Sequence, residues 1–144
     1  MTLPNEGFLG RDRRRIVVFQ EQGRTYRAMN QQEKWVSRYQ IDGGLLKVGK
    51  RCDYGMLYAE EAKEETMVLI ELKGKDLSYA AEQINETLTS LRQHLENKVI
   101  HGRIVLSRVQ IPDIKTTAVV RCQQALAKYQ GRLCYKATLL EENI

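Results

Sequence analysis

The most apolar stretch of the chain, MVLIELK at 67–73, constrains the fold more than any other segment. A run of this length and composition is typical of a strand that is buried on both faces of a sheet. Two charged residues, Glu71 and Lys73, interrupt it, and the alternation of side chains along a strand places both on the same side. Burying an acid and a base there is costly unless something compensates for their charges, and a divalent metal at the carboxylate would do so.

The position of this Glu-Leu-Lys tripeptide matters more than its pattern. The chain contains two other Glu-x-Lys tripeptides, at 61–63 and 96–98. The first lies in a charged loop and the second at the end of an expected helix, where solvent exposure explains them. Only Glu71 and Lys73 stand within an apolar strand.

Further strands and helices surround this segment. Strands are predicted at 16–19, 24–28, 51–59, 103–111 and 132–140, and helices at 77–97 and 116–130. Gln22-Gly23 favours a tight hairpin between the first two strands. Segment 30–44 is ambiguous, because Trp35 to Ile41 alternate as in a strand while Asn30 followed by Glu33 resembles a helix start.

The helix at 77–97 has the clearest pattern. Asp76 is its expected N-cap. Its apolar residues recur at intervals of four and three, which predicts a stripe packed against the sheet. The members of this stripe are Leu77, Ala81, Ile84, Leu88, Leu91 and Leu95. Three polar residues of the same helix, Glu82, Glu86 and Arg92, are expected in solvent.

This order of elements predicts an α/β fold. A strand, a helix and a second strand in succession suggest a parallel crossover. The 144 residues fit one domain, 1–144, with a central mixed β-sheet flanked by helices.

Composition is that of an ordinary globular protein, with 42% hydrophobic and 28% charged residues. No apolar run is long enough to cross a bilayer, and the first ten residues do not resemble a signal peptide, so a cytoplasmic protein with no membrane partner is expected. The three cysteines have no zinc-site spacing, so Cys52, Cys122 and Cys134 are expected to be small, reduced packing residues.

The net charge is +5, and its placement is uneven. The basic N-terminal segment 1–15 contains four arginines, and a second group of cations precedes Asp53. These residues are Arg11, Arg13, Arg14, Arg15, Lys47, Lys50 and Arg51. Such clusters suit a polyphosphate partner, although a solvated face explains most such runs.

Asp53 supplies a second carboxylate beside Glu71. Its strand is expected to pair with 67–73 across the polar loop at 60–66. Acids from adjacent strands can converge on Mg²⁺, which prefers oxygen ligands and stabilises the attacking and leaving oxygens of phosphodiester cleavage. The simpler alternative is a strand-edge carboxylate paired with Arg51.

The stretch RCDYGMLY…VLIELKGKDLSYAAEQI, 51–84, resembles small bacterial and phage members of the PD-(D/E)XK nuclease superfamily. The resemblance implies a restriction-endonuclease-like fold in which Asp53, Glu71 and the backbone carbonyl of Leu72 bind the metal. It assigns Lys73 to the nucleophilic water and places Gln83 toward the site from the first turns of the following helix. A solvated Gln83 is the alternative.

Two departures from the family pattern stand out. Cys52 replaces the proline before the aspartate. The additional acid on an N-terminal helix has no clear match. Glu33 is the best candidate, with a helix-capping or solvated role as the favoured alternative, and Asp42 is second, although Asp-Gly-Gly favours a turn.

The resemblance implies a Mg²⁺-dependent nuclease, with Mn²⁺ as an alternative metal and DNA as the expected substrate, cut as by an endonuclease. Lys75 could hold a phosphate, Tyr79 could stack on a base, and Arg51 is a third substrate-binding candidate. Contact with both strands of a duplex would suggest a homodimer. The alternatives are an inactive module of the same fold that binds nucleic acid or a protein partner, and an unrelated α/β protein.

Overall fold

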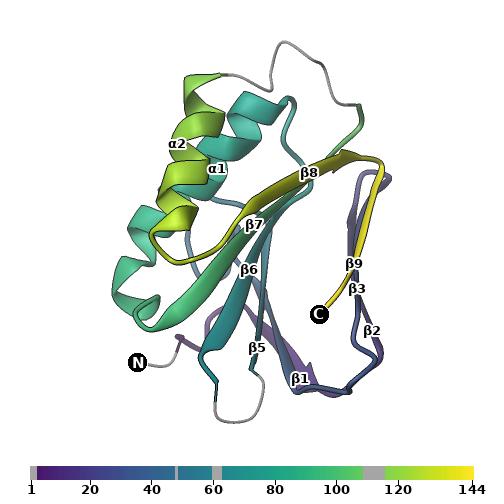
Figure 1. Ribbon diagram of the computed structural model, residues 1–144. Helices are drawn as coiled ribbons and strands as arrows, with labels where there is room; N and C mark the ends of the chain where they lie inside the picture. Colours follow the sequence, from purple (N-terminus) through teal and green to yellow (C-terminus); the bar gives the residue numbers. More distant parts are fainter. Residues whose placement is uncertain (1–2, 48, 60–62, 109–115) are drawn as a thin grey trace.

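The fold combines two sheets and two helices in a single α/β domain (Figure 1). The computed structural model describes residues 3–47, 49–59, 63–108 and 116–144. Its strands are β1 Phe8–Asp12, β2 Ile16–Glu21, β3 Arg24–Met29, β4 Val36–Gln40, β5 Tyr54–Ala59, β6 Glu65–Glu71, β7 Lys98–Leu106, β8 Leu133–Ala137 and β9 Leu139–Asn143. Its helices are α1 Leu77–Ser90, the short 3-10 helix η1 Arg92–His94, and α2 Thr117–Ala127.

The larger sheet has six strands in the order β1-β4-β5-β6-β7-β8. Pairing is antiparallel from β1 to β6 and parallel from β6 to β8, so the predicted mixed sheet and the parallel crossovers are confirmed. Strand β6 lies between β5 and β7, and every residue from Met67 to Glu71 is buried. The expectation of a strand covered on both faces is therefore correct, although β6 ends at Glu71 and Lys73 lies just beyond it.

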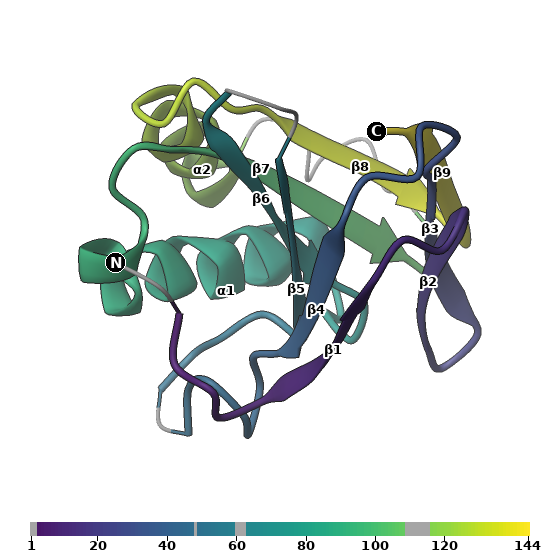
Figure 2. The same cartoon turned by 90° about the horizontal axis from the view of Figure 1, so that it is seen from below.

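A second sheet, in the order β2-β3-β9, corrects the expectation of one sheet flanked by helices. Both helices cover one face of the larger sheet, and the smaller sheet covers the other (Figures 1 and 2). Alternate residues of β6 divide between two cores: Met67 and Leu69 pack with the helices, whereas Val68 and Ile70 pack with the smaller sheet. Glu71 continues the helix-facing series.

Helix α1 packs as its stripe predicts. Ile84, Leu88, Leu91 and Leu95 are all buried. Glu86 and Arg92 are exposed, and Glu82 is half-buried. The helix ends at Ser90 rather than at Asn97, because Leu91 has left helical geometry and η1 takes over. This turn keeps Leu95 buried against the sheet, so the apolar stripe continues beyond the end of α1.

The strand predicted at 132–140 is in fact two strands. Thr138 adopts a left-handed conformation with φ of 67° and lies between β8 and β9. Its amide donates to Leu106 of the larger sheet, while its carbonyl accepts from Thr25 of the smaller one. The chain therefore passes from one sheet to the other at this residue, and β9 pairs in parallel with β3.

The other boundaries differ in smaller ways. Strand β7 begins at Lys98, after Asn97 turns the chain with φ of 61°, and residues 109–111 of the predicted strand lie outside the described residues. Helix α2 is shorter than predicted, and β5 begins at Tyr54. Residues 60–62 of the predicted loop are also outside the described part of the chain.

The hairpin prediction is confirmed, since Gln22 and Gly23 both have positive φ between β2 and β3. The ambiguous segment is a strand, β4, preceded by a turn. Asn30 is buried there and holds the turn by accepting from the amide of Lys34 and donating to the carbonyls of Arg14 and Lys34. Edge strand β1 was not predicted.

The cysteines are free, as expected. Cys52 and Cys122 are buried in the helix-side core, but Cys134 is exposed on β8, so its predicted packing role is wrong.

Candidate active site

The predicted carboxylates meet at the end of the larger sheet where β6 finishes. Asp53 immediately precedes β5, and its amide donates to the carbonyl of Ile70 at 3.1 Å. Glu71 is the last residue of β6 and faces the helices. Tyr54 pairs with Ile70, so Asp53 lies opposite Glu71 on the neighbouring strand, and the charge of Asp53 acts on the Glu71 carboxyl.

Asp53 is held by backbone amides. Its Oδ2 accepts from the amide of Leu72 at 2.7 Å and from that of Lys73 at 2.8 Å. The residue is only 3% exposed. These bonds fix the carboxylate beside the end of β6, with Oδ1 directed toward the Lys73 ammonium at 3.4 Å.

Glu71 is the least satisfied charged group of the site. It is 2% exposed, and its Oε1 has no hydrogen-bond partner among the described residues. Burial raises the pKa of this carboxyl to about 9, and the negative charge of Asp53 adds to the effect. Glu71 is therefore protonated at neutral pH unless a cation compensates for its charge.

Gly74 allows this carboxyl to lie between the strand and α1. A Cβ at Gly74 would come within 2.8 Å of the Ala80 Cβ and 3.2 Å of Glu71 Oε2. Any side chain there would have to displace the helix or the carboxyl group.

Lys73 points into the cluster from just beyond β6. Its Nζ lies 3.4 Å from Asp53 Oδ1 and 3.5 Å from Asp42 Oδ2. Partial burial works to lower the pKa of Lys73, but the attraction of Asp53 and Asp42 outweighs it and leaves the pKa raised. Lys73 is accordingly a cation at neutral pH, suited to orienting a water or stabilising negative charge rather than to removing a proton.

Of the two candidates for an additional acid, the structure brings in Asp42. This residue lies in the turn after β4, where its Oδ1 accepts from Arg51 Nε at 2.7 Å while its other oxygen faces Lys73. Glu33 has left-handed geometry in a turn, begins no helix, and pairs with Arg15 at 3.6 Å. The alternative of an Asp53–Arg51 pair is not observed; Arg51 pairs with Asp42 instead.

Gln83 reaches the approach to Asp53 from the second turn of α1. Its Nε2 donates to the carbonyl of Arg51 at 3.1 Å, and its Oε1 is buried without a partner among the described residues. One turn later, Thr87 Oγ1 accepts from the amide of Cys52 at 2.9 Å. Gln83 is thus anchored rather than solvated.

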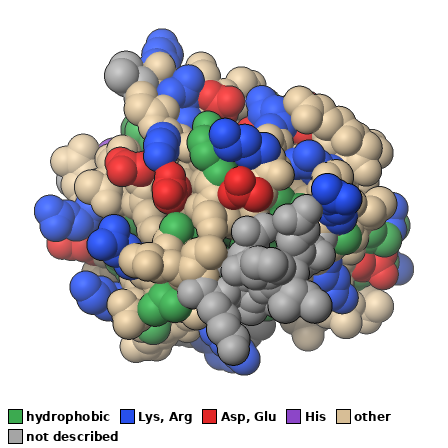
Figure 3. All heavy atoms as spheres, turned by 90° about the horizontal axis from the view of Figure 1, so that it is seen from above, with side chains coloured by type: hydrophobic (Ala, Val, Ile, Leu, Met, Phe, Trp, Pro, Cys, Tyr) green, Lys and Arg blue, Asp and Glu red, His purple; other side chains and the backbone are tan. Residues whose placement is uncertain are grey.

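The predicted substrate contacts surround the first turn of α1. Asp76 caps the helix by accepting from the amide of Tyr79 at 2.7 Å. The ammonium groups of Lys75 and Lys50 lie 5.2 Å and 5.9 Å from the centre of the Tyr79 ring. Figure 3 looks onto this end of the molecule, where basic side chains are interspersed with acidic ones.

Arg24 is a site residue that the sequence did not reveal. It starts β3 in the smaller sheet, and its Nη1 donates to the carbonyls of Leu72 at 2.8 Å and Gly74 at 2.7 Å. The Leu72 oxygen, implied as a metal ligand, is therefore already a hydrogen-bond acceptor. Arg24 directly follows the hairpin glycine Gly23, and no periodic pattern in the sequence marks it as a site residue.

The N-terminal arginines lie elsewhere. Arg11 and Arg13 stack on Trp35, and Arg14 pairs with Asp12, at the end of β1 that pairs with the start of β4. Because β4 runs antiparallel to β5, this is the end of the sheet farthest from Asp53. This arginine cluster is therefore not part of the candidate active site.

The site has two interacting carboxylates rather than a larger cluster. Among the described residues, no group of three or more His, Cys, Asp or Glu side chains is arranged to hold a metal ion. Within the same residues, no helix has the length and apolar character needed to span a membrane. Comparisons with models of protein families, with curated proteins and with solved structures found no match to this chain.

Proposed function

We propose that the protein is a Mg²⁺-dependent nuclease that hydrolyses phosphodiester bonds in nucleic acid, with DNA as the substrate and Mn²⁺ as an alternative metal. The observation that carries the proposal is the pairing of two buried, interacting carboxyls with the Lys73 ammonium 3.4 Å from one of them. Hydrophobic packing gives no reason to gather three ionisable groups there, whereas charge-stabilising chemistry does.

The residues present fit a magnesium ion. Mg²⁺ binds through one or two carboxylates, keeps several waters and uses substrate phosphates as further ligands, so a cluster of three acids is not required. Glu71 Oε1, which lacks a partner among the described residues, and Asp53 are the oxygens that would hold it. When bound, the ion would polarise the phosphoryl group and stabilise the charge that develops on its oxygens.

The chain's own side chains would supply orientation and charge. Lys73 would orient the attacking water and offset negative charge on the phosphate, and its raised pKa keeps it cationic in that role. Gln83 would position Arg51 by bonding its carbonyl. Lys75 and Tyr79 would bind the nucleotides next to the scissile bond through a phosphate contact and stacking.

We also propose a restriction-endonuclease-like fold. Support comes from the antiparallel β5–β6 pair that carries Asp53 and Glu71, followed by α1 and then by β7 in parallel with β6. For a duplex substrate, a homodimer would place one such site at each strand.

The second candidate function is an inactive module of the same fold that binds nucleic acid or a protein partner. The hydrogen bond from Arg24 to the Leu72 carbonyl favours this alternative, because it engages an oxygen that the resemblance assigns to the metal.

The deciding experiment is incubation of the protein with single-stranded, duplex and branched DNA and RNA, in Mg²⁺, Mn²⁺ or EDTA. Metal-dependent cleavage that Glu71→Gln abolishes is expected. The matched control is Glu96→Gln, which makes the same change at an exposed position away from the site. Tight binding without cleavage in any metal would replace the nuclease by the binding module.

A further inference from the structure

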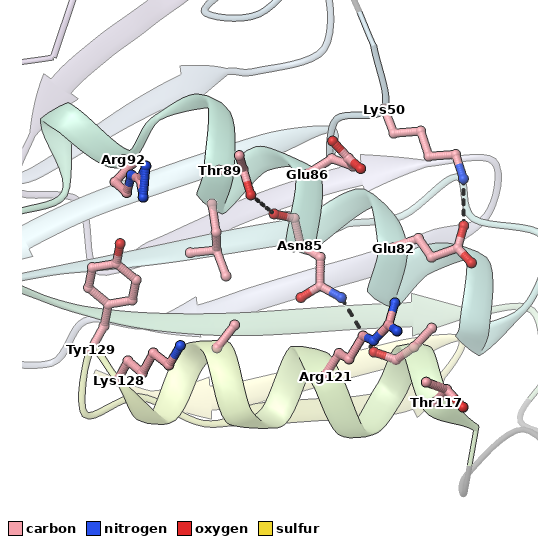
Figure 4. Close-up of a pocket in the computed structure, with 13 residues that line it drawn as sticks. Lys50, Glu82, Asn85, Glu86, Thr89, Arg92, Thr117, Arg121, Lys128 and Tyr129 are labelled. Atoms are coloured by element: carbon pink, nitrogen blue, oxygen red, sulfur yellow. Dashed lines mark hydrogen bonds and ion pairs between the residues drawn. The ribbon is translucent and has the colours of Figure 1, made fainter.

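A groove lies between α1 and α2, on the outer side of the helical layer (Figure 4). Its volume is about 660 Å³. The apolar part of its lining consists of Leu88, Ala118, Ala125 and Tyr129. From Glu82 to Arg92 the groove follows α1 and η1 for roughly 15 Å at 1.5 Å per residue. It is therefore an elongated channel rather than a closed pocket.

The walls of this groove carry an excess of positive charge. Arg92, Arg121 and Lys128 line it and have no ion-pair partner among the described residues. Two acids also line the groove. Glu82 forms an ion pair with Lys50 at 2.5 Å, whereas Glu86 has no ion-pair partner among the described residues. Three cations against one acid favour an anionic occupant.

Lys50 connects the groove with the first turn of α1. Lys50 lines the groove beside Glu82, to which it is bonded in Figure 4, and the same ammonium approaches the ring of Tyr79. Lys75 approaches that ring as well. Lys75 follows Lys73 by two residues in the chain, so Lys75, Tyr79 and Lys50 connect the segment that carries Lys73 with the groove.

We infer that one single strand of nucleic acid lies in the α1–α2 groove as it leaves the active site, an inference that rests on the proposed nuclease function. Arg92, Arg121 and Lys128 line the groove, where cations can contact phosphates. The half-buried Tyr129 offers a face for a base, since stacking needs no particular sequence. The volume is that of a small-ligand site, so the channel accommodates a few nucleotides but not a duplex. The substrate class is accordingly a single strand or a duplex with a single-stranded end.

The test measures binding in EDTA, where cleavage plays no part. The probes are a labelled oligothymidine strand, a blunt duplex of equal length and, as competitor, a polyglutamate peptide. The groove variant is Arg121→Ala with Lys128→Ala, two exposed positions of α2 and its C-cap where alanine suits the helix. The control is Arg132→Ala with Lys136→Ala, which removes the same charge from exposed positions outside the groove.

The groove variant should bind the single strand about 10- to 30-fold more weakly at 0.1 M salt. Each phosphate contact releases about 0.7 counterion when it forms, and the variant loses two such contacts. The slope of log affinity against log salt should fall by about 1.4. The control variant should change affinity by less than about threefold, as expected for charges that do not contact phosphate.

Equal losses in the two variants would overturn the inference, as would a blunt duplex bound more tightly than the strand. Stronger binding of polyglutamate than of the strand would also overturn it and would assign the groove to an acidic polypeptide. Hydrolysis of a small phosphodiester tests the active site separately, because such a substrate is too short to extend from the active site into the groove. If that activity and all cleavage are missing while the groove variant alone loses the strand, the nuclease proposal fails and the groove is a strand-binding surface.

Discussion

Replacing Glu71 by Gln removes the ionisable group of the most buried acid in the site while keeping its shape. Burial and the neighbouring Asp53 hold the pKa of Glu71 near 9, against its ordinary value of 4.5. At neutral pH the folded protein therefore keeps a proton that the unfolded chain has released. Glutamine has no proton to keep, so the variant should be more stable than the wild type wherever this difference exists.

The size of the effect follows from the distance between pH 7 and the ordinary pKa. Retaining a proton about 2.5 pH units above that value costs about 3 kcal/mol, at 1.36 kcal/mol per unit. No discount for solvent screening applies, because the side chain is 2% exposed. For a chain of this length, a gain of about 3 kcal/mol would raise the melting temperature by about 10 °C.

The sign of the pH dependence is also set. The folded pKa of this acid is raised, so between about pH 4.5 and 9 the folded state binds more protons than the unfolded state. The free energy of unfolding of the wild type should therefore fall with rising pH through this window, relative to that of Glu71→Gln. Urea unfolding of both proteins from pH 5 to 9 in EDTA measures the difference. A gap that stays constant across this range would refute the reasoning, because Glu71 would then titrate normally.

Three further predictions concern the same site. Lys73→Ala should abolish cleavage while leaving folding and Mg²⁺ binding intact, and a folded variant that cuts at the wild-type rate, by single-turnover assay, would contradict the role of Lys73. Apparent Mg²⁺ affinity, measured by calorimetry, should rise about tenfold per pH unit below pH 9, because binding must displace the Glu71 proton; a flat profile would contradict this. Arg24→Ala should lower the free energy of unfolding by about 2 kcal/mol and reduce kcat more than it changes KM, because two charge-assisted bonds to the segment carrying Lys73 are lost. The control Arg27→Ala, on the same strand, breaks an exposed ion pair with Glu141 and should lower the free energy of unfolding by less than about 1 kcal/mol. If both variants lost the same free energy of unfolding, the bonds of Arg24 would contribute no more than an exposed ion pair.

Local pattern was sufficient for the parts of the fold that depend on neighbours in the chain. The apolar run at 67–73 identified the buried central strand, and the four-three spacing identified the buried face of α1. Asp53 and Glu71 could be brought together from sequence because strands joined by a short loop pair antiparallel, and alternation then fixes which side chains share a face. Lys73 followed from the same alternation.

Contacts between segments distant in the chain were decided only by the tertiary structure. Thr138 moves the chain from one sheet to the other by bonding to Leu106 and Thr25, and neither residue is visible in the apolar pattern of 132–140. Asp42 joins Lys73, and Arg24 joins the carbonyls of Leu72 and Gly74, across 31 to 50 residues of chain. Periodicity reports which face of an element is buried but not which element covers it. A polar side chain that bonds across two sheets therefore leaves no periodic trace in the sequence, and its role appears only when both sheets are in place.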